Sequence, residues 1–244
     1  MKHLALTLLT TVNRYMCRFA DPVWLGDYPA TMKQLLGDRL PTFTQQQKDL
    51  LKGSADFFGL NHYGTGWVTS STDAEFTECY CTVTEDGFPQ AQSAWLYGSG
   101  WGARKLLNWI KDRYDSPPIY MTEGGWSLAA DTAAEAQHDV DRIKYYANYT
   151  SEVLNAINED GVDVKGYFAW SWMDNYEWEM GYVERFGAVF NDFNFGVDNN
   201  TAANQDEQPQ AQGQVRTPKD TACWFSQGLW ATNTLIDPTG VTCS

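Results

Sequence analysis

The sequence predicts an α/β fold, because short apolar runs alternate with amphipathic segments along much of its length. Apolar runs of strand length lie at 56–61, 119–121 and 162–172. Apolar residues recur with helical spacing over 101–114 and again over 133–159. A strand-helix-strand-helix-strand order is typical of parallel α/β structure.

The ends of the predicted elements have local support. Pro117-Pro118 stops the helix over 101–114, and Gly161 ends the helix over 133–159. The expected buried face of the longer helix consists of Val140, Ile143, Ala147, Val153, Leu154 and Ile157. We also expect a polar excursion over 65–100, a flexible loop over 197–214 and a short last helix over 224–235.

The composition excludes two classes of function. There are 31 acidic and 17 basic residues, and the formal net charge of -14 would repel a phosphate backbone, so no nucleic-acid partner is expected. No apolar run reaches the roughly 18 residues of a membrane-spanning helix, so no membrane partner is expected. The 11 Trp and 13 Tyr residues exceed the needs of an ordinary core, and their flat faces suit sugar rings.

The cysteines and the N-terminus bear on the cellular compartment. The number of cysteines is odd, and their spacing is not that of a zinc finger: Cys17, Cys79, Cys81, Cys223 and Cys243. Buried or free thiols and a disulfide are both compatible with this set. Residues 1–12 resemble a signal peptide, with basic residues followed by an apolar run. Arg14 and Arg18 lie where the cleavage site of a signal peptide has small residues, so a misplaced start within a longer gene is the alternative explanation. The acidic surface and two glycosylation sequons, at Asn148 and Asn199, favour a secreted or vacuolar location.

Polar and aromatic residues follow each predicted strand, where parallel α/β barrels carry their chemistry. They are Asn61, His62 and Tyr63 after the first strand, Glu123 after the second, and Trp170, Trp172, Asp174, Asn175, Glu177 and Trp178 after the third. Each one alone is also typical of structural packing. Together they suit a sugar, because indole faces pack on a pyranose and carboxylates accept hydrogen bonds from its hydroxyls.

Six strings, in order, resemble the C-terminal part of glycoside hydrolase family 1, the β-glucosidase family. They are FADPVWLGDYP (19–29), DFFGLNHY (56–63), PIYMTEGG (118–125), GYFAWSWMDNYEW (166–178), GYVERFGAVF (181–190) and RTPKD (216–220). The resemblance implies strands six to eight of a (β/α)8 TIM barrel, an incomplete barrel because three strands cannot close one. This partial barrel would span 19–235, between a stretch of uncertain origin at 1–18 and a tail at 236–244.

The resemblance also implies roles for individual residues. Glu123 matches the catalytic nucleophile of the family's T-E-N-G signature, in which Gly124 here replaces the Asn. Tyr63 would orient Glu123, and Asn61 matches a polar residue beside it. Four further residues match the sugar-binding site: the platform Trp170, the hydroxyl-binding pair Glu177 and Trp178, and the wall residue Phe186.

The implied activity is hydrolysis of β-glycosides with retention, which uses a nucleophile and a separate acid/base. The family carries the acid/base in an Asn-Glu-Pro string, which this sequence lacks, so a missing N-terminal half is an expected partner and little activity is expected without it. The expected substrate is a β-glucoside or oligosaccharide with an unphosphorylated glycone, since Glu177 would repel a phosphate. No metal or organic cofactor is implied. The alternatives are a carbohydrate-binding remnant without turnover and a thioglucosidase.

Overall fold

The computed structural model describes residues 16–69, 82–84, 87–193, 215–231 and 243. They belong to two compact units. The first lies within Met1–Phe58, Gly66–Gly87 and Trp109–Ile119, and the second within Gly59–Thr65, Phe88–Asn108 and Tyr120–Ser244. The helices are α2 (Cys17–Leu25), α3 (Ala30–Leu36), α4 (Gln45–Leu51), α5 (Gly100–Arg113), α6 (Ala133–Gln137), α7 (Val140–Asn158) and α8 (Asp220–Cys223), with the shorter turns η1 (Gly37–Arg39) and η2 (Trp178–Met180) and the π-helical segment η3 (Trp224–Trp230).

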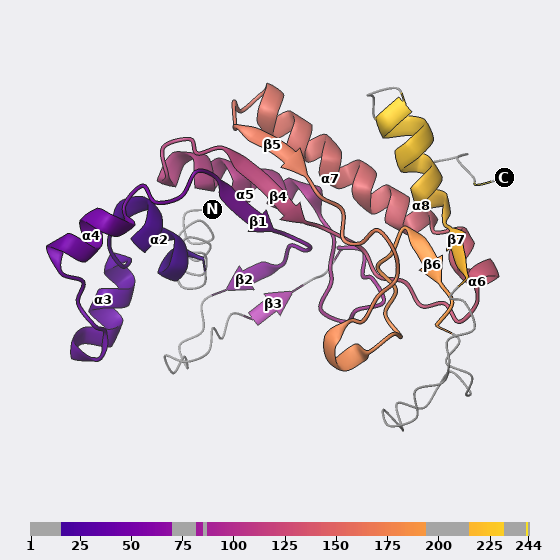
Figure 1. Ribbon diagram of the computed structural model, residues 1–244, viewed down its shortest axis with the longest axis horizontal. Coiled ribbons are helices and arrows are strands. Elements are labelled where there is room, and N and C mark those ends of the chain that lie inside the picture. The colour runs from indigo at the N-terminus through magenta and orange to yellow at the C-terminus, as the bar shows by residue number, and fades with distance from the viewer. Residues whose placement is uncertain (1–15, 70–81, 85–86, 194–214, 232–242, 244) are drawn as a thin grey trace. The chain divides into compact units, whose positions relative to one another are not determined.

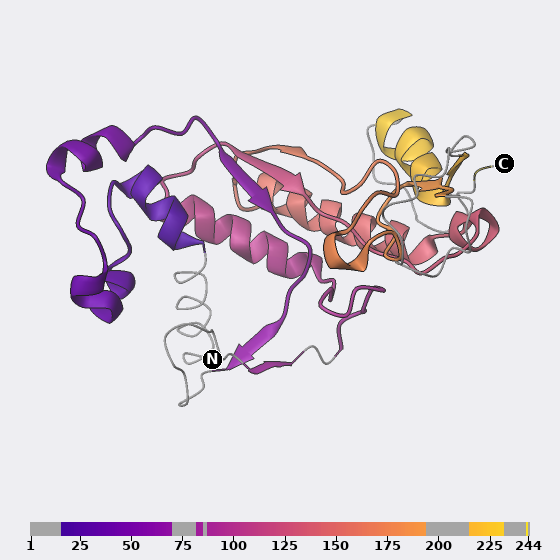
Figure 2. The same ribbon diagram turned by 60° about the horizontal axis from the view of Figure 1, so that its bottom comes forward.

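A three-stranded sheet carries the sequence-predicted site (Figure 1). Its order is β1 (Phe58–Asn61), β4 (Ile119–Glu123), β5 (Val164–Tyr167). The strands run in the same direction. The main-chain bonds from Phe58 N–H to Pro118 O and from His62 N–H to Glu123 O advance together along β1 and β4, and those from Phe168 N–H to Met121 O and from Trp170 N–H to Gly124 O do so along β5 and β4. Their carboxyl ends therefore meet at one edge, and Figure 2 shows α5 and α7 on the same side of the sheet.

Two small antiparallel pairs complete the strands of the described residues. One consists of β2 (Trp67–Thr69) and β3 (Thr82–Thr84), and the other of β6 (Val189–Asn191) and β7 (Arg216–Pro218). The excursion over 65–100 thus contains a hairpin-like pair that the sequence did not predict. Most of its acidic residues, Cys79 and Cys81, and the loop over 197–214 lie outside the described residues.

The first unit is held by a buried carboxylate. Asp21 of α2 is buried and accepts hydrogen bonds from the Arg113 guanidinium, with Nε at 2.9 Å, and from the Tyr114 hydroxyl at 2.8 Å. The rings of Trp24, Phe58 and Tyr114 form a cluster, with Phe58 stacked on the other two at centroid distances of 6.0 and 5.6 Å and Trp24 6.0 Å from Tyr114. Aromatic packing thus covers an ion pair that fixes α2 against the end of α5.

The predicted strands and helices are present in the predicted order. The segment 133–159, predicted as one helix, forms two helices. α6 begins with a capping box between Thr132 and Glu135 and ends at Gln137, and α7 begins at Val140. The break lies at Asp139, whose carboxylate accepts hydrogen bonds from the main-chain N–H and the hydroxyl of Thr221 at 2.8 and 2.7 Å. The backbone leaves the helical path so that this side chain can bind the start of α8.

The expected buried face of α7 is only partly right. Ile143 and Val153 are buried, but Val140 and Leu154 are 38% and 42% exposed. The buried positions also include Arg142, Tyr145, Tyr146, Tyr149 and Ala156. The helical spacing of apolar residues predicted the helix correctly. Its buried face consists largely of tyrosines, which were not counted among the apolar residues of the expected face.

Two of the elements expected after residue 160 have different bounds among the described residues, and 232–235 of the expected last helix lie outside them. The predicted strand over 162–172 is a strand only at Val164–Tyr167, and the predicted helix over 224–235 starts earlier, as α8 and η3. A disulfide joins Cys223 of α8 to Cys243, and the Cys243 N–H also donates to Asp220 at 2.9 Å. Cys17 is buried, within 3.6 Å of the Tyr114 hydroxyl.

Candidate active site

The candidate nucleophile, Glu123, is the last residue of β4, and Tyr63 lies two residues beyond β1. The Tyr63 hydroxyl donates a hydrogen bond of 2.6 Å to Glu123 Oε2. Burial and this bond raise the pKa of Tyr63 far above its usual value, so the hydroxyl is a protonated donor at any working pH. The parallel pairing of β1 and β4 brings both side chains to the same edge of the sheet.

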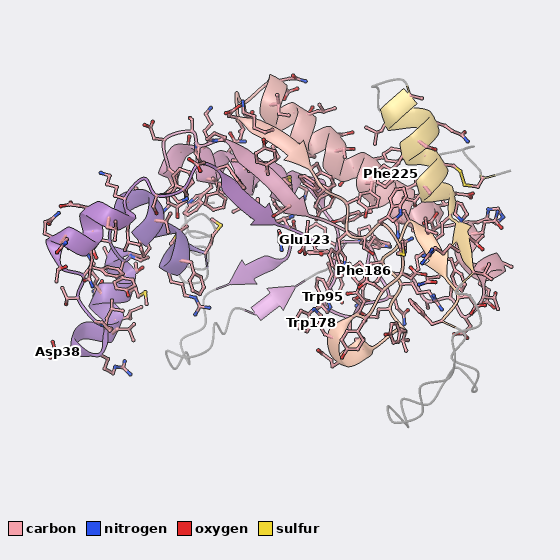
Figure 3. The ribbon with its side chains drawn as sticks, viewed as in Figure 1. Asp38, Trp95, Glu123, Trp178, Phe186 and Phe225 are labelled. Atoms are coloured by element: carbon pink, nitrogen blue, oxygen red, sulfur yellow. A yellow bond between two sulfur atoms is a disulfide. The ribbon has the colours of Figure 1, made fainter. Side chains whose placement is uncertain are left out.

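Aromatic rings surround this pair. Tyr63 meets Phe186 and Trp95 edge-on, with ring centroids 6.1 and 5.8 Å apart. Phe186 is buried, whereas Trp95 is 59% exposed. Figure 3 shows Glu123 at the end of the strands with Phe186, Trp95 and Trp178 on the same side of it. The site therefore has a buried wall and an open aromatic rim.

A second carboxylate, Glu177, is held by an indole. Trp170 Nε1 donates to Glu177 Oε1 at 3.2 Å, and Glu177 is only 9% exposed. Burial raises the pKa of the Glu177 carboxyl, and the negative charge of Glu184 adds to this rise. Trp178 follows at the start of η2 with a left-handed φ of 49° and 78% of its surface exposed. Such a φ is uncommon for a bulky residue, and it turns this indole outwards.

Asn61 is in the same region but has a different partner from Tyr63. It is exposed at the end of β1, and its amide oxygen accepts a hydrogen bond of 2.6 Å from the Thr122 hydroxyl. Asn61 is thus tied to the residue that precedes Glu123, and its link to the carboxylate runs through the β4 main chain.

The two glycines after Glu123 serve close packing. Neither Gly124 nor Gly125 has a positive φ. A Cβ at Gly124 would overlap the Tyr167 hydroxyl, and one at Gly125 would overlap the Trp170 main-chain oxygen. Any side chain at position 124 would force Tyr167 away, which accounts locally for the glycine in place of the family's Asn.

Asp174 is a structural residue and not part of the sugar site that its position among the indoles suggested. It is 2% exposed and accepts hydrogen bonds from Lys219 at 2.8 Å and from Arg185 at 3.0 Å. It also accepts the Gly187 N–H at 2.9 Å. These bonds anchor the segment 171–187, which carries Glu177, Trp178 and Phe186.

His62 is also structural. Its Nδ1 atom is buried without a hydrogen-bond partner among the described residues, and its ring packs near Tyr149 at a centroid distance of 5.8 Å. Burial lowers the pKa of His62 to about 4, so the imidazole is neutral near pH 7. The ring packs beside Tyr149 and supports the strand end that carries Tyr63.

Two features of the site were not predicted. One is Trp95, which lies within the polar excursion over 65–100, where no site residue was expected. The other is a buried network in which the Ser93 hydroxyl donates to Glu184 Oε2 at 2.6 Å and lies 2.7 Å from the Ser127 hydroxyl. It joins the loop that carries Trp95, the loop that follows Glu123 and the loop that carries Phe186. Serines with no regular spacing gave no sequence pattern to find.

Among the described residues, no group of three or more His, Cys, Asp or Glu side chains could hold a metal ion. In the same part of the chain, no helix is long and apolar enough to cross a bilayer. The contacts described above place carboxylates beside aromatic rings, an arrangement suited to nucleophilic attack, hydrogen bonding to hydroxyls and stacking on a sugar face.

Comparison with known proteins decides the family. The model of glycosyl hydrolase family 1 matches residues 9–233. The chain belongs to this family. It is 38% identical over 224 residues to β-glucosidase 4 of rice (Oryza sativa subsp. japonica), a match that covers 86% of this chain and 43% of the rice protein.

Solved structures agree with this assignment. β-Glucosidase 2 of the fungus Trichoderma reesei, in complex with Tris, matches with a TM-score of 0.72 and 40% identity over 84% of this chain and 43% of its own. A rice β-glucosidase mutant in a covalent complex with glucose matches with a TM-score of 0.79 and 34% identity over 92% of this chain and 47% of its own. The chain spans less than half the length of these relatives, and its fold is a partial α/β barrel of the family.

Proposed function

We propose that this chain is the C-terminal part of a retaining β-glucosidase, with Glu123 as the nucleophile that forms a covalent glycosyl-enzyme. The observation that carries the proposal is the 2.6 Å hydrogen bond from Tyr63 to Glu123 Oε2, at the edge of the sheet where Trp170 and Glu177 also lie. Among the described residues no hydrogen bond engages Glu123 Oε1, which leaves this oxygen for attack on an anomeric carbon.

The roles of the other residues follow from their chemistry. Trp170 offers a face for the sugar and holds Glu177, whose carboxylate accepts hydrogen bonds from sugar hydroxyls. Trp178 and Asn61 add polar contacts at the rim, and Phe186 forms the wall behind Tyr63. Because a second negative charge beside Glu177 would be repelled, the glycone is unphosphorylated.

The proton donor of the reaction comes from outside this sequence. Retention requires two carboxyl groups about 5–5.5 Å apart, one to attack and one to protonate the leaving oxygen. We assign the three parallel strands to positions six to eight of the barrel, so a segment with the earlier strands would supply the acid/base and complete the sheet. Without it, loss of general acid–base assistance alone lowers the rate about 10²–10⁴-fold.

The compartment that we propose is oxidising, either secreted or vacuolar. The Cys223–Cys243 disulfide supports this location, because disulfides persist in such compartments and are rare in the cytosol.

An activated substrate tests the nucleophile without the acid. 2,4-Dinitrophenyl 2-deoxy-2-fluoro-β-D-glucopyranoside has a leaving group that needs no proton, and its fluorine slows hydrolysis of the ester. We expect intact-mass spectrometry to show one added fluoroglucosyl group on the purified chain, and none on Glu123→Gln. A chain that is folded by circular dichroism and takes no label would contradict the proposal.

The exposed indoles Trp95 and Trp178 favour one second candidate, a sugar-binding protein without turnover. It would bind glucose or cellobiose in isothermal titration calorimetry with an affinity that Trp178→Ala weakens, yet would take no fluoroglucosyl label. The same two measurements therefore separate the two functions.

A further inference from the structure

Three tyrosines of α7 hydrogen-bond to the main chain at the ends of all three strands of the sheet. Tyr145 and Tyr149 each donate to the Tyr63 carbonyl oxygen, which follows β1, at 2.9 Å. The Tyr146 hydroxyl lies 3.0 Å from the carbonyl oxygen of Trp170, beyond β5, and 3.3 Å from that of Gly124, directly after β4. All three side chains are buried, with at most 5% of their surface exposed.

These hydroxyls meet carbonyls that the sheet itself does not use fully. Gly124 O already accepts the Trp170 N–H at 2.7 Å, so the chain beyond β4 and the chain beyond β5 are joined once by the backbone. The Tyr146 hydroxyl lies against both of their carbonyls and joins them a second time. A buried carbonyl without a donor is costly, and no water is needed where a side chain supplies the donor.

Packing leaves this junction little freedom. A Cβ at Gly125 would overlap the Trp170 oxygen, so the main chain that follows Glu123 lies directly on the main chain of Trp170. The Tyr145 and Tyr149 rings stack with centroids 4.2 Å apart, and Tyr145 and Tyr146 meet edge-on at 5.4 Å. The three hydroxyls are therefore held on a rigid helix face.

We propose that Tyr146 is a positioning residue for the reaction, because its hydroxyl fixes the backbone that carries Glu123 relative to the Trp170 platform. Tyr145 and Tyr149 position Tyr63, the hydrogen-bond donor to Glu123, in the same way. The inference rests on the proposed function. A shift of the nucleophile against the bound sugar lowers the rate of attack, since about 1 Å of misplacement costs up to about 10²-fold.

The arrangement predicts unequal effects of removing the hydroxyls. A carbonyl oxygen has two lone pairs, and Tyr63 O uses both, so either Tyr145→Phe or Tyr149→Phe leaves one donor in place. Tyr146→Phe leaves Gly124 O with the Trp170 N–H, but among the described residues it leaves no donor on the Trp170 carbonyl oxygen. Each single change at 145 or 149 should slow labelling by less than about threefold, and the double change by more than the product of the two.

The test is labelling of the full chain by the fluoroglucoside, with the rate constant at saturation and the half-saturating concentration measured separately. Tyr146→Phe should lower the rate constant about tenfold and leave the half-saturating concentration within about twofold. The matched control is Tyr114→Phe, which removes another buried hydroxyl, the donor to Asp21 in the first unit, and should change neither value. The proposal would be overturned if Tyr146→Phe changed only the half-saturating concentration, or if Tyr114→Phe lowered the rate constant by the same factor.

Hydrogen exchange tests the same proposal without the reaction. We expect amide exchange in Tyr146→Phe to accelerate in peptides that contain 124–126 and 169–171, and to remain at the wild-type rate there in Tyr114→Phe. Unchanged exchange in both peptides would overturn the positioning role. If the wild-type chain takes no label, the proposed function fails, and the exchange measurement alone then decides the role of Tyr146.

Discussion

The two parts of the site are held in place by different kinds of interaction. The residues at the ends of β1 and β4 are held by neutral groups: the Tyr63 hydroxyl on Glu123 and the α7 tyrosine hydroxyls on the main chain. The segment 171–187, which presents Glu177 and Trp178, is held by buried charges, with Asp174 between Lys219 and Arg185.

The difference fits the roles that we propose for the two parts. In the proposed mechanism, a cation hydrogen-bonded to Glu123 would stabilise its negative charge and weaken its attack, whereas the neutral Tyr63 hydroxyl orients the carboxylate without adding a charge. The segment 171–187 has little regular structure, so its shape depends on a few strong anchors. Charged hydrogen bonds at buried positions supply them.

The largest expected effect is the loss of the charged anchor. Burial lowers the pKa of Lys219 to about 7, and Asp174 opposes that effect. At pH 6 both Lys219 and Arg185 are cations, and Asp174→Asn removes the counter-ion of both. Arg185 then lacks its carboxylate partner, and Lys219, without the charge that opposes its burial, gives up its proton. We expect urea unfolding to show a loss of about 3–5 kcal/mol.

The control for this variant is Asp141→Asn, which removes an exposed ion pair with Lys144 and should cost less than about 1 kcal/mol. Equal losses in the two variants would show that charge does not hold the segment 171–187 in place.

A smaller effect is expected from pH at His62. Its folded-state pKa is about 4, against 6.5 for the free side chain. Below pH 6.5 the unfolded chain binds a proton that the folded chain excludes, so stability is complete above pH 6.5 and declines as the pH falls towards 4. The shift corresponds to about 3 kcal/mol.

His62→Gln cannot titrate, so its free energy of unfolding should change less than that of the wild type between pH 7 and pH 4.5. Parallel pH dependence in the two proteins would mean that the imidazole is solvated and free to take up the proton.

Much of this site could be predicted from the order of strands and the residues after them. Tyr63, Glu123, Trp170 and Glu177 stand at or near strand ends in the sequence, and the structure places hydrogen bonds between them in two pairs. The parallel sheet made that grouping predictable, because it places the strand ends at one edge.

The rest depended on contacts that leave no local pattern. Asp174 lies among the indoles and looks like a ligand for sugar, but its partner Lys219 is 45 residues away in the sequence. Likewise, Asp139 breaks the predicted long helix because of its bonds to Thr221. Trp95 reaches the site from a loop whose composition indicates only solvent exposure.

A further effect is expected from the neutral hydroxyl of Tyr63. Tyr63→Phe removes one hydrogen bond to a carboxylate, a contribution of about 1.5–3 kcal/mol, and should slow fluoroglucosyl labelling about 10–100-fold. Phe186→Leu, which alters the wall behind the ring but no hydrogen bond, is the control and should slow it less. Labelling of Tyr63→Phe at the wild-type rate would show that the hydroxyl does not orient Glu123.

The most direct test of the account is to find which residue carries the sugar. After incubation with the fluoroglucoside, the chain is digested and the labelled peptide is sequenced by fragmentation in the mass spectrometer. The account predicts the fluoroglucosyl group on Glu123, in the peptide that contains 118–125. A label on Glu177 or Glu184 would contradict it.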